Sequence, residues 1–95
     1  MHFVYILLCR DGRYYIGLTQ NVANRLDVHN SGNGPAFTAR RLPVRLVYQE
    51  SFLTLEEAAQ REKQLKRWSR AKKKALISGN LQLLSELSAC RGTQP

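Results

Sequence analysis

Glu62 is the acidic residue whose position in this sequence is least typical of a surface charge. It follows Ala58 by four residues and precedes Leu65 by three, on the apolar side of a predicted helix. A carboxylate there costs free energy unless it is paired or binds a cation. Its oxygens could form a salt bridge with a nearby arginine or reach water at the edge of the apolar side. They could also bind one Mg²⁺ or Mn²⁺, since such ions use few protein carboxylates and otherwise take water and phosphate as ligands.

Arg25 and His29 form a second pair of residues with chemical potential. They are four residues apart within a predicted helix, so their side chains project from one face. A guanidinium group donates two hydrogen bonds to phosphate oxygens and stays charged. An imidazole can transfer a proton near neutral pH. The pair indicates phosphate binding and proton transfer, with a solvated helix face as the alternative.

Tyr5 and Tyr15 place two phenols in predicted strands. A tyrosine in a strand is usually a core residue whose hydroxyl group finds a hydrogen-bond partner. A phenol has a pKa near 10, so it is a poor base at neutral pH unless neighbouring cations favour the phenolate. The two tyrosines therefore gain a chemical role only if cationic groups lie beside them.

The charge of the chain points to an anionic partner. There are 15 lysines and arginines against 7 aspartates and glutamates, a net charge of +8. A compact domain this basic is typical of proteins that bind DNA, RNA or an anionic membrane surface. Residues 61–74 alone hold eight cations and one acid, a density suited to a phosphate backbone. The residues that we expect to contact nucleic acid are Arg40, Arg41, Lys63, Lys66, Arg67, Arg70, Lys72 and Lys73.

A β-hairpin is predicted to position the two tyrosines. Residues 3–9 and 13–18 are rich in aliphatic and aromatic side chains, and turn-forming residues separate them. A three-residue loop would place Gly12 in the left-handed bulge position and put Tyr5 and Tyr15 on the same face. A two-residue loop would put them on opposite faces. We favour the three-residue loop because it makes the other face wholly apolar, although the residue pattern does not exclude the shorter one.

The remaining elements complete a small mixed fold. Asn21, Thr54 and Ser69 are suited to cap helices, and Thr54 with Glu57 forms a capping box. The expected helices cover residues 22–30, 54–68, 69–77 and about 81–87, and a third strand covers 44–51. This order predicts an α+β fold in which helices flank a three-stranded antiparallel sheet. We expect one domain over residues 1–88 and a flexible tail over 89–95.

Other classes of protein are poorly supported by the sequence. The chain of 95 residues has room for one core, and no apolar run approaches the length of a membrane span. Cys9 and Cys90, with His2 and His29, match no disulfide scaffold or zinc spacing. No secretion signal is recognisable. These features favour a reduced, cytoplasmic protein.

The combined pattern resembles the GIY-YIG nuclease superfamily. The residues that carry the resemblance are Tyr5, then Tyr15-Ile16-Gly17 ten residues later, then Arg25 and His29, then Glu62 on a later helix. The likeness covers roughly residues 2–77 and is greatest to small bacterial proteins that consist of little more than this domain. It implies a three-stranded antiparallel sheet flanked by helices. It also implies DNA phosphodiester hydrolysis with one Mg²⁺ or Mn²⁺ ion, in DNA repair or recombination.

The resemblance assigns a role to each matching residue. Glu62 corresponds to the metal-binding glutamate and Arg25 to the arginine that binds the scissile phosphate. Tyr5 corresponds to the tyrosine proposed to deprotonate the attacking water, and Tyr15 to the one that helps to hold water and phosphate. His29 matches a position that is histidine or tyrosine in relatives.

Gly17 matches the motif glycine, where a side chain would crowd the site. Two features depart from the family pattern. Phe3-Val4 replaces the Gly-Ile of the first motif, and Asn80 is not a match for the family asparagine because it follows Gly79 in a predicted turn.

Three functions follow from these observations. The first is a metal-dependent DNA endonuclease that is structure-selective or weakly sequence-specific. The second is a nucleic-acid-binding module of the same fold that lacks turnover. The third is a helix-turn-helix reader built from residues 54–77, which would leave the tyrosines and Arg25 without a role. The first requires both phenols to lie on one face of the sheet, with the carboxylate of Glu62 beside them.

Overall fold

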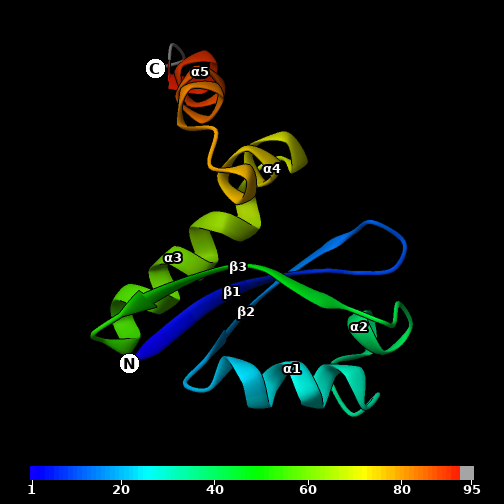
Figure 1. Ribbon diagram of the computed structural model, residues 1–95. Helices are drawn as coiled ribbons and strands as arrows, with labels where there is room; N and C mark the ends of the chain where they lie inside the picture. The colour runs from blue at the N-terminus through cyan, green and yellow to red at the C-terminus, as the bar shows by residue number, and fades with distance from the viewer. Residues whose placement is uncertain (93–95) are drawn as a thin grey trace.

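The computed structural model describes residues 1–92 as a three-stranded antiparallel sheet with five helices (Figure 1). The strand order is β2-β1-β3, so β2 and β3 are the two edges of the sheet. The α+β class expected from the sequence is confirmed. The strands are β1 (His2–Leu8), β2 (Tyr14–Thr19) and β3 (Arg45–Phe52), and the helices are α1 (Val22–Asn30), α2 (Ala36–Ala39), α3 (Leu55–Arg67), α4 (Arg70–Ser78) and α5 (Leu81–Gly92).

The β1–β2 hairpin has the register of the three-residue loop. Tyr5 pairs with Gly17, and Leu7 pairs with Tyr15. The amide of Cys9 donates to the carbonyl of Arg13 at 2.8 Å. Gly12 has a φ of +88°, the left-handed conformation that glycine adopts without steric strain. Side chains two positions apart along a strand share a face, so Tyr5 and Tyr15 both lie on the face opposite to Val4 and Ile6.

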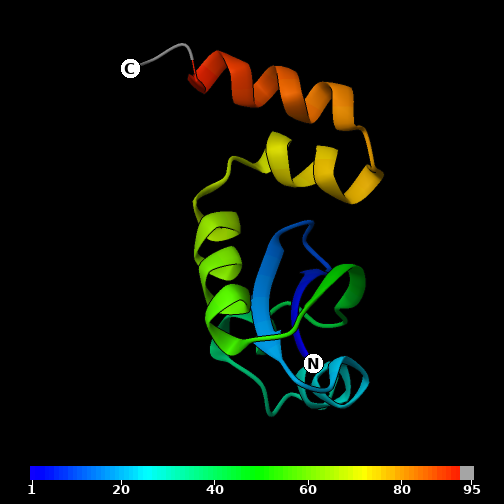
Figure 2. The same ribbon diagram turned by 90° about the vertical axis from the view of Figure 1, so that its left-hand side faces the viewer.

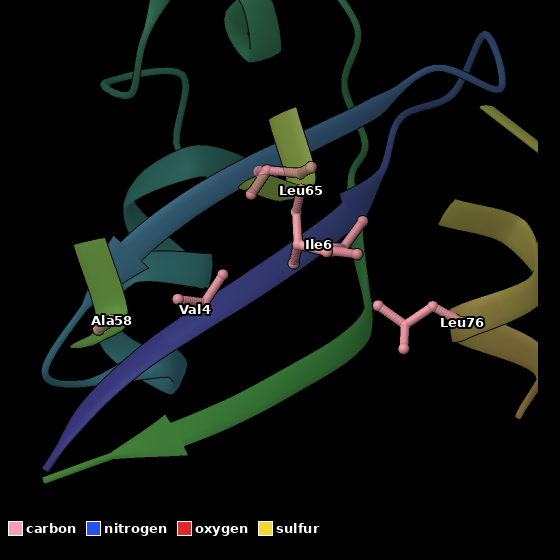
Figure 3. Packing of buried hydrophobic residues seen from close by; sticks show 6 residues of the cluster. Val4, Ile6, Ala58, Leu65 and Leu76 are labelled. Carbon is pink, nitrogen blue, oxygen red and sulfur yellow. The ribbon is translucent and has the colours of Figure 1, made fainter. Parts of the chain in front are cut away.

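Helices α3 and α4 cover the first face of the sheet. Val4 and Ile6 of β1 pack against Ala58 and Leu65 of α3 and Leu76 of α4 (Figure 3). Val4, Ile6, Ala58 and Leu65 are all completely buried. This cluster is the main apolar core, and it fixes the position of α3 across the strands.

Helix α1 covers the opposite face. Tyr5, Leu7 and Cys9 are buried there together with Val44, and Leu26 of α1 packs against them. Figure 2 shows α3 and α1 on opposite sides of the strands. Asn30, the last residue of α1, connects this helix to the segment just before β3. Its side chain donates a hydrogen bond to the carbonyl of Val44 and accepts one from the amide of Val44.

The predicted helix caps are present. The side chains of Asn21, Thr54 and Ser69 accept hydrogen bonds from the amides of Asn24, Glu57 and Lys72. Gly79 ends α4 in the left-handed conformation, with a φ of +74°. Asn80 then accepts a hydrogen bond from the amide of Leu83, so it caps α5 and has a structural role.

Two segments differ in detail from the expected elements. The short helix α2 lies outside the helices and strands that we expected, and it begins directly after Pro35, whose fixed φ suits a helix start. Helix α5 continues to Gly92, so the segment expected to be a tail from residue 89 is helical up to that point. Residues 93–95 of the expected tail lie outside the described residues, and the proposed division at residue 88 stays a prediction. Among residues 1–92, no helix is long and apolar enough to cross a membrane.

Candidate active site

A chain of buried hydrogen bonds joins β1, α1 and α2. Tyr5 Oη lies 2.9 Å from Nε2 of His29, and Nδ1 of His29 lies 2.8 Å from Oγ1 of Thr38. Thr38 donates its hydroxyl proton to the carbonyl of Pro35 at 3.1 Å. Oγ1 must therefore accept the proton of His29 Nδ1, which leaves Nε2 as the acceptor for the Tyr5 hydroxyl. The imidazole is thus held in a single tautomer whose basic nitrogen faces the phenol.

Burial controls the protonation of this pair. The side chains of His29 and Thr38 are fully buried, and Tyr5 is nearly so. Burial, with a smaller contribution from the charge of Arg25, lowers the pKa of His29 from its ordinary value of 6.5. Burial also raises the pKa of Tyr5 to about 12, with Tyr15 and Glu62 adding to the rise and Arg25 opposing it. At neutral pH the pair is therefore a neutral phenol that donates to a neutral imidazole.

Tyr15 stands beside this pair on the same face. Its ring meets the imidazole of His29 edge-on, with 5.1 Å between the ring centroids, and lies 6.4 Å from the ring of Tyr5. The ring of Phe37, on α2, also lies near Tyr15, with 6.0 Å between the two ring centroids. The two phenols and the imidazole form one aromatic cluster, which meets the requirement that the tyrosines lie together.

Gly17 leaves the space that the ring of Tyr5 occupies. A Cβ atom on Gly17 would lie 2.8 Å from Cε2 of Tyr5 and closer still to Cζ and Oη. No side chain fits there unless the tyrosine moves. The crowding that the family resemblance implies for this glycine is thus a direct contact with Tyr5.

Arg25 lies on the exposed side of α1, one turn before His29. Its charge acts on both Tyr5 and His29. It also lines a groove of about 580 Å³, which we call the Leu55 groove; the other residues lining it are His2, Leu18, Thr19, Gln20, Asn21 and Leu55. A cation at the mouth of a groove, beside the phenol, is well placed to bind a phosphate oxygen.

Glu62 lies on α3, which packs on the face of the sheet opposite to Tyr5. Its side chain is 22% exposed and forms an ion pair with Lys66 at 3.3 Å, one turn further along the helix. The negative charge of Glu62 contributes to the raised pKa of Tyr5. Glu62 is therefore within electrostatic range of the Tyr5 phenol, although its helix packs on the opposite face of the sheet.

The donor set around Glu62 fits Mg²⁺ or Mn²⁺. Among the side chains that the structure describes, those of residues 1–87, there is no group of three or more histidines, cysteines, aspartates or glutamates that could hold a metal ion. Zinc prefers a nearly complete set of protein ligands, whereas Mg²⁺ binds through one or two carboxylates and takes the rest of its ligands from water and phosphate. Glu62, a single carboxylate that is 22% exposed, is compatible with the second requirement.

The predicted nucleic-acid contacts are divided among three places. Lys66 and Lys73 line a groove of about 240 Å³ with Tyr14, Tyr15, Ile16 and Phe37, which we call the Lys66 groove. Arg70 stacks on Tyr14 at 4.6 Å, next to this groove. Lys63, Arg67 and Lys72 line a separate groove of about 440 Å³ with Gln60, Gln64 and Trp68.

Two of the expected contacts serve internal interactions. Arg41 binds Asp11 at 2.9 Å and the carbonyl of Phe37, and its guanidinium group lies over the Phe37 ring. Lys72 is only 7% exposed and lies over the Trp68 ring at 4.2 Å. Arg40 is exposed on the surface near α2. Residues 61–74 span the second half of α3 and the first half of α4, and their basic side chains line separate grooves. They therefore do not form one continuous basic surface.

Sequence reasoning missed Thr38 and Phe37. Both lie on α2, a helix of four residues in a segment to which we assigned no element from the sequence. Thr38 follows His29 by nine residues, a spacing that no regular element gives, so no periodic pattern links them. The one available signal was Phe37, an aromatic residue in a segment rich in glycine and polar residues.

Comparisons with known proteins show a family match and similar relatives over most of this chain. Residues 1–75 match the family described as the GIY-YIG catalytic domain. A UPF0213 protein of Streptococcus pneumoniae serotype 4 is 47% identical over 78 residues, which cover 82% of this chain and 79% of that protein. The UPF0213 protein VNG_2274C of Halobacterium salinarum is 47% identical over 77 residues, which cover 81% of this chain and 100% of that protein.

Two solved structures share the fold. The solution structure of the UPF0213 protein BH0048 from Bacillus halodurans is 45% identical, with a TM-score of 0.54, and the match covers 81% of this chain and 82% of that one. The solution structure of protein EF2693 from E. faecalis is 38% identical, with a TM-score of 0.56 and coverage of 84% and 86%. All five candidate site residues lie within the matched residues 1–75, and the chain belongs to the GIY-YIG catalytic domain family, a family of nucleases.

Proposed function

We propose that this protein is a divalent-metal-dependent endonuclease that hydrolyses phosphodiester bonds in DNA. The observation that carries the proposal is the hydrogen bond from Tyr5 to His29, with Tyr15, Arg25 and Glu62 around it. Buried proton-transfer groups beside an arginine and a lone carboxylate suit a reaction that activates water next to a phosphate.

Tyr5 and His29 would act together as the base. A phenol with a pKa of about 12 does not ionise at neutral pH, so Tyr5 cannot serve as a preformed phenolate. It can accept a proton from the attacking water while it passes its own hydroxyl proton to Nε2 of His29. The product of this double transfer is an imidazolium ion whose Nδ1 proton remains bound to Thr38. The neutral imidazole, whose pKa is lowered mainly by burial, is ready to receive that proton.

Arg25 and Glu62 would neutralise the phosphate. The guanidinium group of Arg25 can donate two hydrogen bonds to non-bridging oxygens and so stabilise the charge that develops in the transition state. The carboxylate of Glu62 would hold a Mg²⁺ or Mn²⁺ ion, which would supply Lewis-acid stabilisation of the same charge when bound. Lys66 releases Glu62 for this role only if its ammonium group moves to another anion, such as a neighbouring phosphate.

A nucleic-acid-binding module without turnover is the second candidate. The ion pair between Lys66 and Glu62 favours it, because a carboxylate that is already paired binds a metal ion less well. Both candidates share the basic grooves, so DNA binding does not separate them. Cleavage does.

Plasmid, branched and linear DNA incubated with the protein and Mg²⁺ or Mn²⁺ provide the test. We expect Glu62→Gln to lower the cleavage rate by roughly 100-fold or more, as the loss of a group that stabilises the transition state does, while DNA binding persists. Glu56→Gln is the matched control, because Glu56 is an exposed carboxylate in the first turn of the same helix. Cleavage that is equal in wild type and Glu62→Gln would show that the site is wrong. Absence of cleavage by the wild type, with salt-dependent binding intact, would favour the second candidate.

A further inference from the structure

The two grooves beside the active site lie on opposite sides of Gly17 along the edge strand β2. The Lys66 groove contains residues 14–16 of β2, and the Leu55 groove contains residues 18–19. Each groove also takes residues from α3 or α4 on one face of the sheet and from α1 or α2 on the other. Both therefore wrap around the outer edge of β2, and Gly17, with the phenol of Tyr5 against it, separates them.

The two grooves differ in chemistry. Two lysines and three aromatic residues line the Lys66 groove, and Arg70 lies beside it. In the Leu55 groove the only lysine or arginine is Arg25, which faces the active site. Apolar surface from Leu18 and Leu55 and polar groups from His2, Thr19, Gln20 and Asn21 form the rest of that lining.

Gln20 is an exposed polar side chain of this groove that could bind a ligand. Thr19 and Asn21 are held by local hydrogen bonds: the hydroxyl of Thr19 bonds to the backbone of Asn21, and the carboxamide oxygen of Asn21 caps α1. Gln20 is exposed, and among residues 1–87, whose side chains the structure describes, its carboxamide has no hydrogen-bond partner. Leu55 opposite is 53% exposed, so it offers a flat apolar contact.

We infer that the Leu55 groove binds a nucleobase next to the scissile phosphate and reads it through Gln20, while the Lys66 groove binds the phosphate backbone on the other side of the cut. This inference rests on the proposed function. The volume of about 580 Å³ is in the range of small-ligand sites, Leu18 and Leu55 supply apolar surface for a planar base, and the other lining residues supply polar groups for its edge. A carboxamide presents a donor and an acceptor to the edge of a base, whereas lysine contacts to phosphates carry no sequence information.

Cleavage of a DNA pool with a randomised segment, followed by sequencing of the product ends, gives the base preference at each position around the cut. We expect the wild type to prefer certain bases on one side of the cut. Gln20→Ala should reduce that preference by roughly 5-fold or more, which corresponds to the loss of a good contact to a base edge. The double variant Lys66→Ala/Lys73→Ala is the matched control. It should keep the base preference and lower the slope of log affinity against log salt by about 1.4 to 1.8, for two phosphate contacts.

A binding measurement separates failure of this inference from failure of the proposed function. The variant Glu62→Gln, labelled with ¹⁵N, is titrated with oligonucleotides that differ in one base. Amide signals of Gln20 and Leu55 that depend on that base support the inference even if the wild type cuts no DNA. A wild-type enzyme that cuts DNA with a base preference identical to that of Gln20→Ala overturns the inference and leaves the proposed function intact. Amide signals at Gln20 and Leu55 that do not move with any oligonucleotide overturn it as well.

Discussion

The hydroxyl group of Tyr5 donates a hydrogen bond of 2.9 Å to Nε2 of His29, and this bond crosses from the sheet to helix α1 in the interior of the protein. The two residues are 24 positions apart in the chain. His29 is fully buried and Tyr5 is only 2% exposed, so solvent offers little replacement for either partner. The bond therefore determines both where the phenol points and which protonation state the imidazole takes, and most of the predictions below depend on it.

Thr38 fixes the tautomer of His29. Thr38→Val removes the acceptor for the Nδ1 proton and should destabilise the fold by about 1–3 kcal/mol, the range for a buried donor without a partner. Thr38→Ser keeps the hydroxyl and should restore the wild-type behaviour. The measurement is the pair of ¹⁵N chemical shifts of the His29 ring, which report which nitrogen is protonated. Identical ring shifts in wild type and Thr38→Val would refute this role.

The pKa of His29 predicts a loss of stability in mild acid. Because burial lowers this pKa from 6.5, the unfolded state binds a proton at a higher pH than the folded state. The free energy of unfolding should therefore be constant above about pH 7 and should fall as the pH drops below about 6.5, where the unfolded histidine is protonated. Urea unfolding between pH 7.5 and about 5 measures this, because free carboxyl groups stay largely ionised over that range.

Variants of the two histidines assign the effect. His29→Gln should remove most of the pH dependence of stability between pH 7.5 and about 5. His2→Gln is the control, because His2 lies at the start of β1 and is only partly buried. A pH dependence that survives in His29→Gln would show that another group is responsible.

Gly17→Ala should disturb Tyr5 without any change to the other site residues. The new Cβ would overlap the phenol ring, so the ring must move and weaken its bond to His29. We expect a destabilisation of about 1–3 kcal/mol, as for other overpacked interiors, together with loss of cleavage. Tyr5→Phe removes the hydroxyl oxygen, one of the atoms nearest to the new Cβ, so the two substitutions should cost less together than the sum of their separate effects. Strict additivity in thermal unfolding would contradict a direct contact.

The two phenols should differ in their effect on stability. Tyr5→Phe leaves Nε2 of His29 without a donor and should cost about 1–3 kcal/mol. Tyr15→Phe removes a hydroxyl group that has no hydrogen-bond partner among the described side chains of residues 1–87, so its cost should stay below about 0.5 kcal/mol. Chemical unfolding compares the two. If both substitutions lower the cleavage rate but only Tyr5→Phe lowers stability, the Tyr15 hydroxyl acts on the substrate.

Much of the fold could be predicted because local chemistry and long-range packing agree. The bulge glycine Gly12 and the alternation of apolar residues favoured the register that the structure has, and the caps at Asn21, Thr54 and Ser69 marked the helix starts correctly. In each case a few neighbouring residues specify the structure. No distant contact was needed to read them.

The site was only partly predictable, because its hydrogen bonds connect segments with no periodic relation. The spacing of Arg25 and His29 predicts one helix face, but it does not show that Arg25 stays exposed while His29 is buried. The role of Thr38 depends on how the loop after α1 folds back, which residue types alone do not determine. For Lys72, the charge of the residue favoured a surface contact with nucleic acid. In the structure its side chain is largely buried and lies over the ring of Trp68.

The three-residue turn at Arg10–Gly12 has a consequence for mutations far from the active site. Because neighbouring side chains on a strand alternate between faces, deletion of one residue from this turn would shift the pairing of β2 by one position and send Tyr15 through to the other surface of the sheet. Every reactive group would still be encoded, yet the two phenols would no longer meet. An exposed loop with no chemistry of its own thus decides whether the two tyrosines can meet on one face of the sheet.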